Sequence, residues 1–450
     1  MPAIDPREAA RTSRTRLEAA EAYLEGLINL ERSPSYAGAR LSLAPIRALL
    51  ARLGNPERTL RVLHIAGSKG KGSTALLSEA LLRAAGLRVG TFTSPHLERW
   101  TERFRIDGRE VPGDRLADAI ERLRPAVDAL REGADPPSFF DATTAAALLL
   151  FADERLDVAI LEVGLGGRLD STNAVTPAVT CITTIELEHT EKLGSTLAAI
   201  AGEKAGIAKP GVPLVTGALP PEAAAVAAQR ASELGAPLAR LGDELVVAVK
   251  SESLDAIETR FEEGGFACEF TLGVAGVHQV ANAALALACA RRLGVASDAV
   301  LARAARIAFA RPELPGRIEI VSRAPWIVID GAHTEASARA LARVLARIPR
   351  RSAHLVVSIS AGKALAAICA ALAPLADRIT VTRAEPIRSL TPAEVADAMR
   401  AASPALDLRI VPNPHLALRA AREAVGNEDL LCATGSFYLA GIARKVLLPA

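Results

Sequence analysis

Two patterns of apolar residues alternate along the chain. Short apolar runs bounded by glycine or proline are typical of buried strands, whereas apolar residues that recur every three or four positions are typical of amphipathic helices. In the first part of the chain the pattern predicts strands at 61–66, 89–92, 158–163 and 179–185, and helices at 17–30, 43–53, 73–85, 114–130 and 141–151. Strands that alternate with helices predict a mainly parallel sheet with helices on both faces.

The pattern changes twice further along. Residues 243–273 alternate between apolar and polar positions around a Gly-Gly pair, which predicts an antiparallel β insert, and a helix follows at 279–293. A Pro- and Gly-rich stretch at 311–316 is typical of a linker. A second series of strands is then predicted at 318–321, 326–329, 354–358, 379–381, 408–411 and 430–432. We therefore expect two α/β domains, residues 1–310 and residues 311–450, the second being smaller and Rossmann-like.

The composition narrows the classes of function. Half of the 450 residues are hydrophobic and 23% are charged, which is ordinary for a globular protein. A net charge of +2 and 3% aromatic residues give little basis for a nucleic-acid surface. No apolar run is long enough to cross a membrane, and the N-terminus lacks the apolar centre of a signal peptide. The five scattered cysteines have no metal-ligand spacing, which predicts reduced thiols. We expect a cytoplasmic monomer that binds neither nucleic acid nor membrane.

A phosphate-binding turn is the strongest candidate for chemistry. The strand at 61–66 leads into a Gly/Ser/Lys-rich turn, and a helix follows. Glycines let backbone N–H groups face an anion, the positive end of the helix points at the same place, and Lys71 adds a cation. The pattern predicts ATP binding by Ser68, Lys69, Gly70, Lys71, Gly72 and Ser73. Because the spacing departs from the usual motif at Ile65 and at the extra Gly72, a plain turn between a strand and a helix is the alternative.

Further polar residues follow neighbouring predicted strands. Glu162 ends the strand at 158–163, and His189 comes shortly after the strand at 179–185. Ligands of parallel α/β sheets collect at the carboxyl ends of the strands. We therefore expect Glu162, His189 and the phosphate-binding turn to share one crevice.

Several short stretches together resemble one family. They are 64–74 (His-Ile-Ala-Gly-Ser-Lys-Gly-Lys-Gly-Ser-Thr), 92–97 (Phe-Thr-Ser-Pro-His-Leu), 161–170, 203–207, 278–283, 315–317 and 330–333. In order and spacing they resemble folylpolyglutamate synthase and dihydrofolate synthase, members of the Mur ligase superfamily. The resemblance implies a central P-loop ATPase domain with a mainly parallel sheet and a smaller Rossmann-like C-terminal ligase domain.

The resemblance implies an ATP-dependent amide ligase. In this chemistry ATP phosphorylates a carboxylate, and the amine of L-glutamate displaces phosphate from the acyl phosphate. The implied acceptors are folates such as tetrahydrofolate, and dihydropteroate as well. One or two Mg²⁺ ions would spread charge over the transferring oxygens. The alternatives are a Mur-type ligase that acts on a non-folate carboxylate, a folylpolyglutamate synthase with no second activity, and a nucleotide-binding regulatory protein.

Carried over by motif, Ser94, Glu162 and His189 would bind Mg²⁺. Glu162 ends an apolar strand, where an unpaired carboxylate is costly, so a ligand role is favoured. Taken alone, Ser94 would be a turn residue before a proline, and His189 an ordinary surface or core histidine. Lys204 matches a lysine that the family carbamylates, which would create an anion for a second Mg²⁺. The alternative for Lys204 is a helical lysine paired with a neighbouring glutamate.

The resemblance also implies ligands for the two organic substrates. Asn282, Arg317 and Asp330 would contact ATP between the domains, and His333 would join Lys71 and Lys204 in the catalytic machinery. Arg317 could instead be a surface charge after a Pro-Gly turn. The folate end would lie against Ser138, Phe139, Phe140, Leu169, Asp170 and Ser171. The two phenylalanines could stack on a pterin ring, although such a pair before a helix is also typical of a core.

The chain departs from the family pattern in several places. Arg40 stands where bifunctional relatives have an acidic residue, and Glu188 where an aspartate usually precedes the histidine. Thr334 follows His333 where asparagine is common, and the segment that ends in Lys363 replaces an expected Asp-Lys-Asp. In the phosphate-binding turn, Ser-Lys replaces the common Thr-Asn. These departures leave the prediction of ATP binding intact, but they leave the choice of acceptor and the number of activities open.

Overall fold

The computed structural model describes residues 6–29 and 42–448. The chain divides into two compact units. The first comprises residues 1–249, 259–271 and 280–312, and the second comprises residues 250–258, 272–279 and 313–450. The last boundary falls inside the stretch that the sequence marks as a linker. The sequence analysis did not predict that residues 250–258 and 272–279 belong to the second unit.

An eight-stranded sheet forms the framework of the first unit. Its order is β4-β3-β2-β5-β1-β6-β7-β8. The six strands β2, β5, β1, β6, β7 and β8 pair in parallel with their neighbours. Strands β3 and β4 pair antiparallel and form one edge of the sheet. The bounds are β1 Val62–Ala66, β2 Val89–Phe92, β3 Phe104–Ile106, β4 Arg109–Glu110, β5 Val158–Glu162, β6 Val179–Ile182, β7 Leu214–Thr216 and β8 Leu238–Arg240. The predicted mainly parallel sheet is confirmed.

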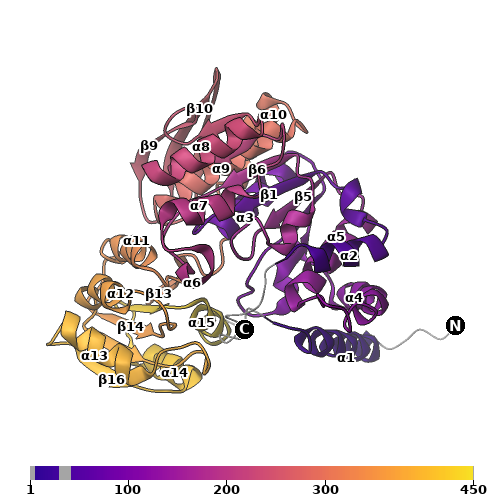
Figure 1. The fold of residues 1–450 in the computed structure, drawn as a ribbon. Helices are drawn as coiled ribbons and strands as arrows, with labels where there is room; N and C mark the ends of the chain where they lie inside the picture. The colour runs from indigo at the N-terminus through magenta and orange to yellow at the C-terminus, as the bar shows by residue number, and fades with distance from the viewer. Residues whose placement is uncertain (1–5, 30–41, 449–450) are drawn as a thin grey trace. The chain divides into compact units, whose positions relative to one another are not determined.

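Helices cover this sheet. Their bounds are α1 Pro6–Glu25, α2 Ala44–Arg52, α3 Lys71–Ala84, α4 Gly113–Asp128, α5 Phe139–Asp153, α6 Thr190–Leu193, α7 Leu197–Ala205, α8 Pro221–Glu233, α9 His278–Leu293 and α10 Asp298–Ala308. Helices α1, α2, α4 and α5 pack together (Figure 1). The sequence of α5 is apolar around its whole circumference, and nearly all of its residues are buried, as such a pattern requires. The predicted bounds of the first helix, 17–30, are wrong, because α1 begins and ends earlier.

The predicted β insert forms a separate three-stranded sheet in the order β11-β10-β9. The strands are β9 Val246–Glu252, β10 Ile257–Glu263 and β11 Phe266–Leu272. Buried and exposed residues alternate along β10 and β11, as the period of a half-buried strand demands. Gly264 and Gly265 make the turn between them with φ of 53° and 85°, a conformation that favours glycine.

The second unit has its own six-stranded sheet in the order β12-β13-β17-β14-β15-β16. The strands are β12 Glu319–Arg323, β13 Trp326–Ile329, β14 Ala353–Val357, β15 Arg378–Val381, β16 Asp407–Ile410 and β17 Leu430–Thr434. All pair in parallel except β12, which pairs antiparallel with β13. The helices are α11 Glu335–Leu345, α12 Leu365–Leu372, α13 Pro392–Ala402, α14 Pro414–Ala424 and α15 Phe437–Leu447. This arrangement confirms the predicted smaller α/β domain.

Strand register fixes where the candidate site lies in the first unit. Strand β1 lies between β5 and β6, with Ile65 opposite Glu162 and Ala66 opposite Ile182. The carboxyl ends of the three strands therefore meet at one edge of the sheet. Strand β6 ends three residues before the predicted Ile185. After β6 the chain contacts the phosphate-binding turn, because the Ser68 N–H donates to the Thr184 carbonyl at 2.8 Å.

Candidate active site

The turn between β1 and α3 can form only with glycine at two positions. Gly67 has a φ of 145°, and a β-carbon there would lie 1.9 Å from Thr183 Oγ1. Gly70 caps α3 with a φ of 84°, and its β-carbon would lie 2.4 Å from Asn282 Oδ1. Because Gly70 takes the left-handed conformation, the helix begins at Lys71 rather than at the predicted Ser73. The first backbone N–H groups of α3 are thus available to an anion.

Thr183 and Thr184 hold this turn from the neighbouring strand. The Thr183 hydroxyl donates to the Lys69 carbonyl, and the Lys69 N–H donates to Thr184 Oγ1 at 2.8 Å. Ser68 Oγ accepts from the Glu186 N–H at 2.9 Å. The Asn282 side chain reaches the same helix start, since it accepts from the Thr74 hydroxyl at 3.3 Å. Asn282, which is predicted to bind ATP, therefore lies beside the phosphate-binding turn.

Two lysines converge on one carbonyl oxygen. Lys71 Nζ donates to the Gly67 oxygen at 2.9 Å, and Lys204 Nζ donates to the same oxygen at 3.0 Å. Lys204 comes from the last turn of α7, and only 2% of its surface is exposed. The phosphate-binding turn therefore holds two positive charges, as stabilisation of a transferring phosphoryl group requires.

Glu188 balances these charges. Its carboxylate accepts from Lys204 Nζ at 3.0 Å and lies 3.8 Å from Lys69 Nζ. Burial acts to raise the pKa of Glu188, but the ammonium groups of Lys204, Lys71 and Lys69 outweigh it and hold the pKa at about 2. Glu188 was noted in the sequence only as a departure from the family pattern, and its place beside the lysines was missed.

Lys204 has an unusual environment for an amine. Burial and the nearby charge of Lys71 lower its pKa to about 8, although Glu188 opposes that shift. A fraction of the side chain is therefore neutral near pH 8, and only the neutral amine can react with CO₂. Lys204 is paired with a glutamate, as in the alternative, but the partner is Glu188 from the segment after β6, because Glu203 pairs with Arg168 at 2.7 Å.

Two of the three predicted Mg²⁺ ligands lie on neighbouring strands. Glu162 ends β5 with 5% of its surface exposed, and its carboxylate accepts from the Ser94 N–H at 3.0 Å. Ser94 follows β2, which pairs with β5. A carboxylate and a hydroxyl are the oxygen ligands that Mg²⁺ takes, with waters completing its shell. The residues present therefore fit Mg²⁺.

His189, the third predicted ligand, follows Glu188 directly and begins the short helix α6 with a φ of 47°. Its side chain is 44% exposed and lies 3.9 Å from Glu191. Within residues 6–29 and 42–448, no group of three or more His, Cys, Asp or Glu side chains is placed to hold a metal ion. Water or substrate oxygens would therefore have to complete a magnesium site.

Two of the predicted folate residues, Ser138 and Ser171, meet at Asp141, which the sequence prediction missed. Ser138 caps α5, and its N–H and hydroxyl donate to Asp141 Oδ2 at 2.8 and 2.6 Å. The Ser171 hydroxyl donates to Asp141 Oδ1 at 2.7 Å. Asp170 caps the short 3-10 helix Ser171–Ala174. Its carboxylate accepts from the Leu165 N–H at 2.9 Å. These contacts tie the glycine-rich turn after β5 to the start of α5, and Leu169 is half-buried in that turn.

The two phenylalanines before α5 have different surroundings. Phe139 is 5% exposed and belongs to the core of the first unit, with the Arg103 guanidinium 5.4 Å from its ring. Phe140 is half-buried, lies 6.0 Å from the ring of Phe92, and faces Gly164 so closely that a β-carbon there would lie 2.6 Å from it. Phe139 therefore matches the core alternative, and Phe140 borders the glycine-rich turn.

In the second unit, two predicted residues, Arg317 and His333, lie against Phe437. The Arg317 guanidinium lies 5.4 Å from the Phe437 ring, and the His333 ring meets the same ring edge-on at 6.2 Å. Arg317 is half-buried and also donates to the Pro315 carbonyl at 2.9 Å. His333 Nδ1 lies 2.8 Å from the Gly331 carbonyl. No motif in the sequence singled out Phe437.

Asp330 holds two turns of the second unit. Its carboxylate accepts from the Ile318 N–H at 2.7 Å and from the Ala332 N–H at 2.8 Å. Burial raises its pKa to about 6. Ile318 has a φ of 51°, which is rare for a β-branched residue, and the bond to Asp330 fixes that conformation. Asp330 follows the carboxyl end of β13, as predicted for a ligand of a ribose hydroxyl.

Comparison with known proteins extends this description to the whole chain. A family model for the Mur ligase middle domain matches residues 65–290, and one for the Mur ligase glutamate ligase domain matches residues 316–437. The folylpolyglutamate synthase of Lacticaseibacillus casei is 34% identical over 410 residues, which cover 90% of this chain and 94% of that protein. The dihydrofolate synthase/folylpolyglutamate synthase of Bacillus subtilis is 38% identical over 314 residues, 68% of this chain and 73% of the relative. The chain belongs to the folylpolyglutamate synthase family of Mur ligases.

Solved structures of this family agree with the fold. Mycobacterium tuberculosis folylpolyglutamate synthase, solved in complexes with ADP and AMPPCP, superimposes with a TM-score of 0.86 at 32% identity, covering 96% of this chain and 98% of that one. The Escherichia coli protein FolC, solved with DHPP and ADP, gives 0.83 at 32% identity, covering 96% and 97%. The predicted family, fold class and ATP-dependent ligase class are confirmed.

Two of the residues that depart from the family pattern, Thr334 and Lys363, lie next to the starts of helices α11 and α12. Thr334 caps α11, and its hydroxyl accepts from the Ser337 N–H at 3.4 Å. Lys363 is half-buried in the turn before α12, where its carbonyl accepts from the Leu365 N–H at 2.8 Å. Arg40 lies outside the described residues.

No helix in the part of the chain that the structure describes is long and apolar enough to cross a membrane.

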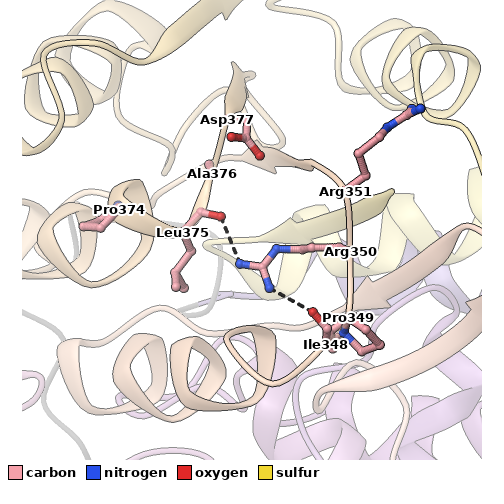
Figure 2. A pocket seen from close by; sticks show the side chains of 8 residues that line it. All are labelled: Ile348, Pro349, Arg350, Arg351, Pro374, Leu375, Ala376 and Asp377. Atoms are coloured by element: carbon pink, nitrogen blue, oxygen red, sulfur yellow. Dashed lines mark hydrogen bonds between the residues drawn. The ribbon is translucent and has the colours of Figure 1, made fainter. Parts of the chain in front are cut away.

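The second unit has a hollow with a volume of about 460 Å³, and Figure 2 shows the side chains that line it. It is lined by Ile348, Pro349, Arg350, Arg351, Pro374, Leu375, Ala376 and Asp377, next to the amino ends of β14 and β15. Arg350 donates to the carbonyls of Ile348 and Leu375, which gives it a structural role. Asp330 follows the carboxyl end of a strand in the same parallel sheet, so the hollow and Asp330 lie at opposite edges.

Proposed function

We propose that this protein is an ATP-dependent ligase that adds L-glutamate to folates, including tetrahydrofolate, through an acyl phosphate, and that dihydropteroate is a second acceptor. The relatives named above are folylpolyglutamate and dihydrofolate synthases, and the chain covers most of their length. The observation that carries the proposal is the convergence of Lys71 and Lys204 on the Gly67 carbonyl, within a glycine-dependent turn at the carboxyl edge of a parallel sheet.

The chain's own residues divide the work of the first step. The N–H groups of the turn and of the start of α3 bind the phosphates of ATP. Lys71 stabilises the negative charge that grows on the γ-phosphoryl oxygens as the acceptor carboxylate attacks. The products are ADP and an acyl phosphate, and the neutral amine of L-glutamate then displaces phosphate to form the amide. Ser94, Glu162 and His189 would hold Mg²⁺, which, when bound, neutralises phosphate charge.

The carbamylation of Lys204 belongs to this proposal. Its neutral amine would attack CO₂, an N–C bond would form, and one amine proton would leave to solvent. The product is an anion that could hold a second Mg²⁺. A pKa of about 8 supports this chemistry, because a more ordinary lysine would hold almost no neutral amine at physiological pH. The ion pair with Glu188 opposes it, since it stabilises the ammonium form.

We assign the remaining predicted residues as further parts of the proposal. Residues 1–310 would act as the ATP-binding domain, and residues 311–450 as the ligase domain. The nucleotide would contact Asn282, Arg317 and Asp330, with His333 nearby as a catalytic residue. The folate end would lie near Ser138, Phe140, Leu169, Asp170 and Ser171, with Phe139 supporting from the core. The protein would act as a cytoplasmic monomer.

One assay tests the proposed function. The protein is supplied with Mg-ATP and L-glutamate, and ADP release is followed with tetrahydrofolate, with dihydropteroate, or with neither. We expect release with each acceptor, and none without glutamate. Turnover with tetrahydrofolate alone would remove the second activity. The absence of ADP release that depends on glutamate and on either acceptor would overturn the proposal.

A further inference from the structure

A histidine in the centre of the first sheet is not used by the proposed mechanism. His64 lies in the middle of β1, and none of its surface is exposed. Its Nε2 lies 2.8 Å from Thr172 Oγ1, and Thr172 is likewise fully buried. The Thr172 hydroxyl in turn meets Asp170 Oδ1 at 2.5 Å. A continuous polar chain therefore runs from the sheet core to the glycine-rich turn.

The direction of each hydrogen bond from His64 through Thr172 to Asp170 follows from the number of protons that each group can donate. Asp170 accepts from the backbone N–H groups of Leu165 at 2.9 Å and Thr172 at 3.0 Å, so its oxygens act as acceptors. The single hydroxyl proton of Thr172 is therefore donated to Asp170. Since Thr172 Oγ1 can then only accept from the ring, His64 Nε2 must carry a proton.

The environment of His64 agrees with this tautomer. Burial lowers its pKa to about 3, with the charge of Lys209 adding to the effect, so the ring is neutral. Among the described residues, His64 Nδ1 has no hydrogen-bond partner. With Nε2 protonated, Nδ1 is a bare acceptor. The opposite tautomer would bury an unpaired N–H and would compete with Asp170 for the Thr172 proton.

A second His–Thr pair provides a comparison within the same chain. In the second unit, His354 Nε2 lies 2.8 Å from Thr380 Oγ1, and His354 Nδ1 also has no partner among the described residues. That pair joins β14 to β15, and within the described part of the structure no hydrogen bond carries it on to a carboxylate. What distinguishes His64 is the third member, Asp170, which lies among the residues proposed to bind folate.

We propose that His64, acting through the Thr172 hydroxyl, is a positioning residue that holds Asp170 and the glycine-rich turn in the conformation that binds the pteroyl end of the acceptor. This inference rests on the proposed function. A polar side chain at the centre of an apolar strand costs stability unless it is hydrogen-bonded, and a valine or isoleucine would suit the sheet better. The polar chain to Asp170 accounts for a histidine at this position.

The test compares variants that break one link with variants that keep it. His64→Leu removes the donor, and Thr172→Val removes the hydroxyl at constant shape. His64→Gln keeps an N–H near the Nε2 position, and Thr172→Ser keeps the hydroxyl. We expect the first two to raise KM for the folate acceptor about 3- to 10-fold, with KM for ATP changed less than about twofold. The two conservative variants should restore most of the acceptor KM. The double variant should be no worse than Thr172→Val alone, because both changes break the same chain.

Several results would overturn the inference. They are an unchanged acceptor KM in Thr172→Val, an equal rise in KM for ATP, or no rescue by Thr172→Ser. His354→Leu is the matched control, since it should lower stability without changing the acceptor KM. If His64→Leu does not fold, nitrogen NMR of histidine-labelled wild-type protein decides the tautomer, and a protonated Nδ1 on His64 would also overturn the inference. Wild-type protein that binds no folate would remove the proposed function, whereas folate binding that Thr172→Val leaves unaltered would remove only this inference.

Discussion

Lys204 Nζ lies 3.0 Å from Glu188 Oε1, and both side chains are almost completely buried, with 2% and 8% of their surfaces exposed. A buried ion pair stabilises little by itself, but the loss of one partner leaves an unpaired charge. Because Lys204 also binds the Gly67 carbonyl, this pair connects the phosphate-binding turn to the segment after β6. It is therefore the contact on which the electrostatics of the site depend most.

Replacement of Glu188 should expose this dependence. The pKa of Glu188 falls from 4.5 to about 2 in the folded protein, so the carboxylate contributes stability that is present above about pH 4.5 and is lost as pH falls through 2. We expect Glu188→Gln to lower the free energy of unfolding by ~3 kcal/mol at pH 7. Urea unfolding at several pH values measures this, and the gap to wild type should narrow below pH 4.5. Glu203→Gln, at a more exposed pair, should cost less than ~1 kcal/mol. Equal losses in the two variants would contradict the assignment.

Lys71 should be essential for turnover. Lys71→Ala removes the cation beside the γ-phosphoryl group, and we expect kcat to fall at least ~100-fold because that charge acts mainly in the transition state. The measurement is ADP release at saturating Mg-ATP. Lys250→Ala, on the exposed strand β9, is the control and should retain activity. A near-normal kcat in Lys71→Ala would show that the turn is not the phosphate site.

Carbamylation of Lys204 should depend on CO₂ and pH. Because its pKa is about 8, the fraction of neutral amine rises as pH increases through that value. We expect intact-protein mass spectrometry in bicarbonate to show a gain of one CO₂ that increases from pH 7 to pH 9 and is absent in Lys204→Arg. Removal of CO₂ should lower activity reversibly. Full activity in CO₂-free buffer, with no mass gain in bicarbonate, would show that unmodified Lys204 is the active form.

Glycine at position 70 should be required for the geometry of the turn. Gly70→Ala would strain a φ of 84° and place a β-carbon 2.4 Å from Asn282 Oδ1. We expect KM for ATP to rise at least ~10-fold, because both the start of α3 and Asn282 must shift. Gly86→Ala is the control, since it has a φ of 90° but no atom within 4 Å of the new β-carbon. It should cost ~1 kcal/mol of stability and leave KM for ATP unchanged. Equal kinetic effects would argue against a specific role for position 70.

Asp330 should matter to nucleotide binding through the turns that it holds. An asparagine offers one oxygen, so Asp330→Asn would leave either the Ile318 or the Ala332 N–H without its acceptor. We expect a loss of ~1–3 kcal/mol in stability and a rise in KM for ATP. Asp377→Asn is a matched control at the opposite edge of the sheet, because Asp377 also accepts a backbone N–H, that of Ala353, at 2.7 Å. Because asparagine keeps one oxygen for that single N–H, Asp377→Asn should cost less stability than Asp330→Asn and leave KM for ATP unchanged. A kinetic effect of Asp377→Asn as large as that of Asp330→Asn would contradict the proposal.

Local signals in the sequence were sufficient for much of the fold. Strand and helix periods predicted β2 and β13 to the residue, and the linker signal at 311–316 marked a real boundary between units. The excursions at 250–258 and 272–279 were not predicted, because membership of a compact unit depends on contacts between distant segments. The antiparallel pairing of β12 was missed for the same reason.

The sequence by itself determined many of the elements, the glycine-rich turn after β1 and the family, because glycine conformations, periodicity and motif order are local properties of the chain. Only the tertiary structure decided which charges face one another. Glu188 and Lys204 are distant in sequence, as are Ser171 and Asp141, and no local pattern specifies such pairs. They form because parallel strands bring their carboxyl ends to one edge, where buried polar groups must find partners to offset the loss of water.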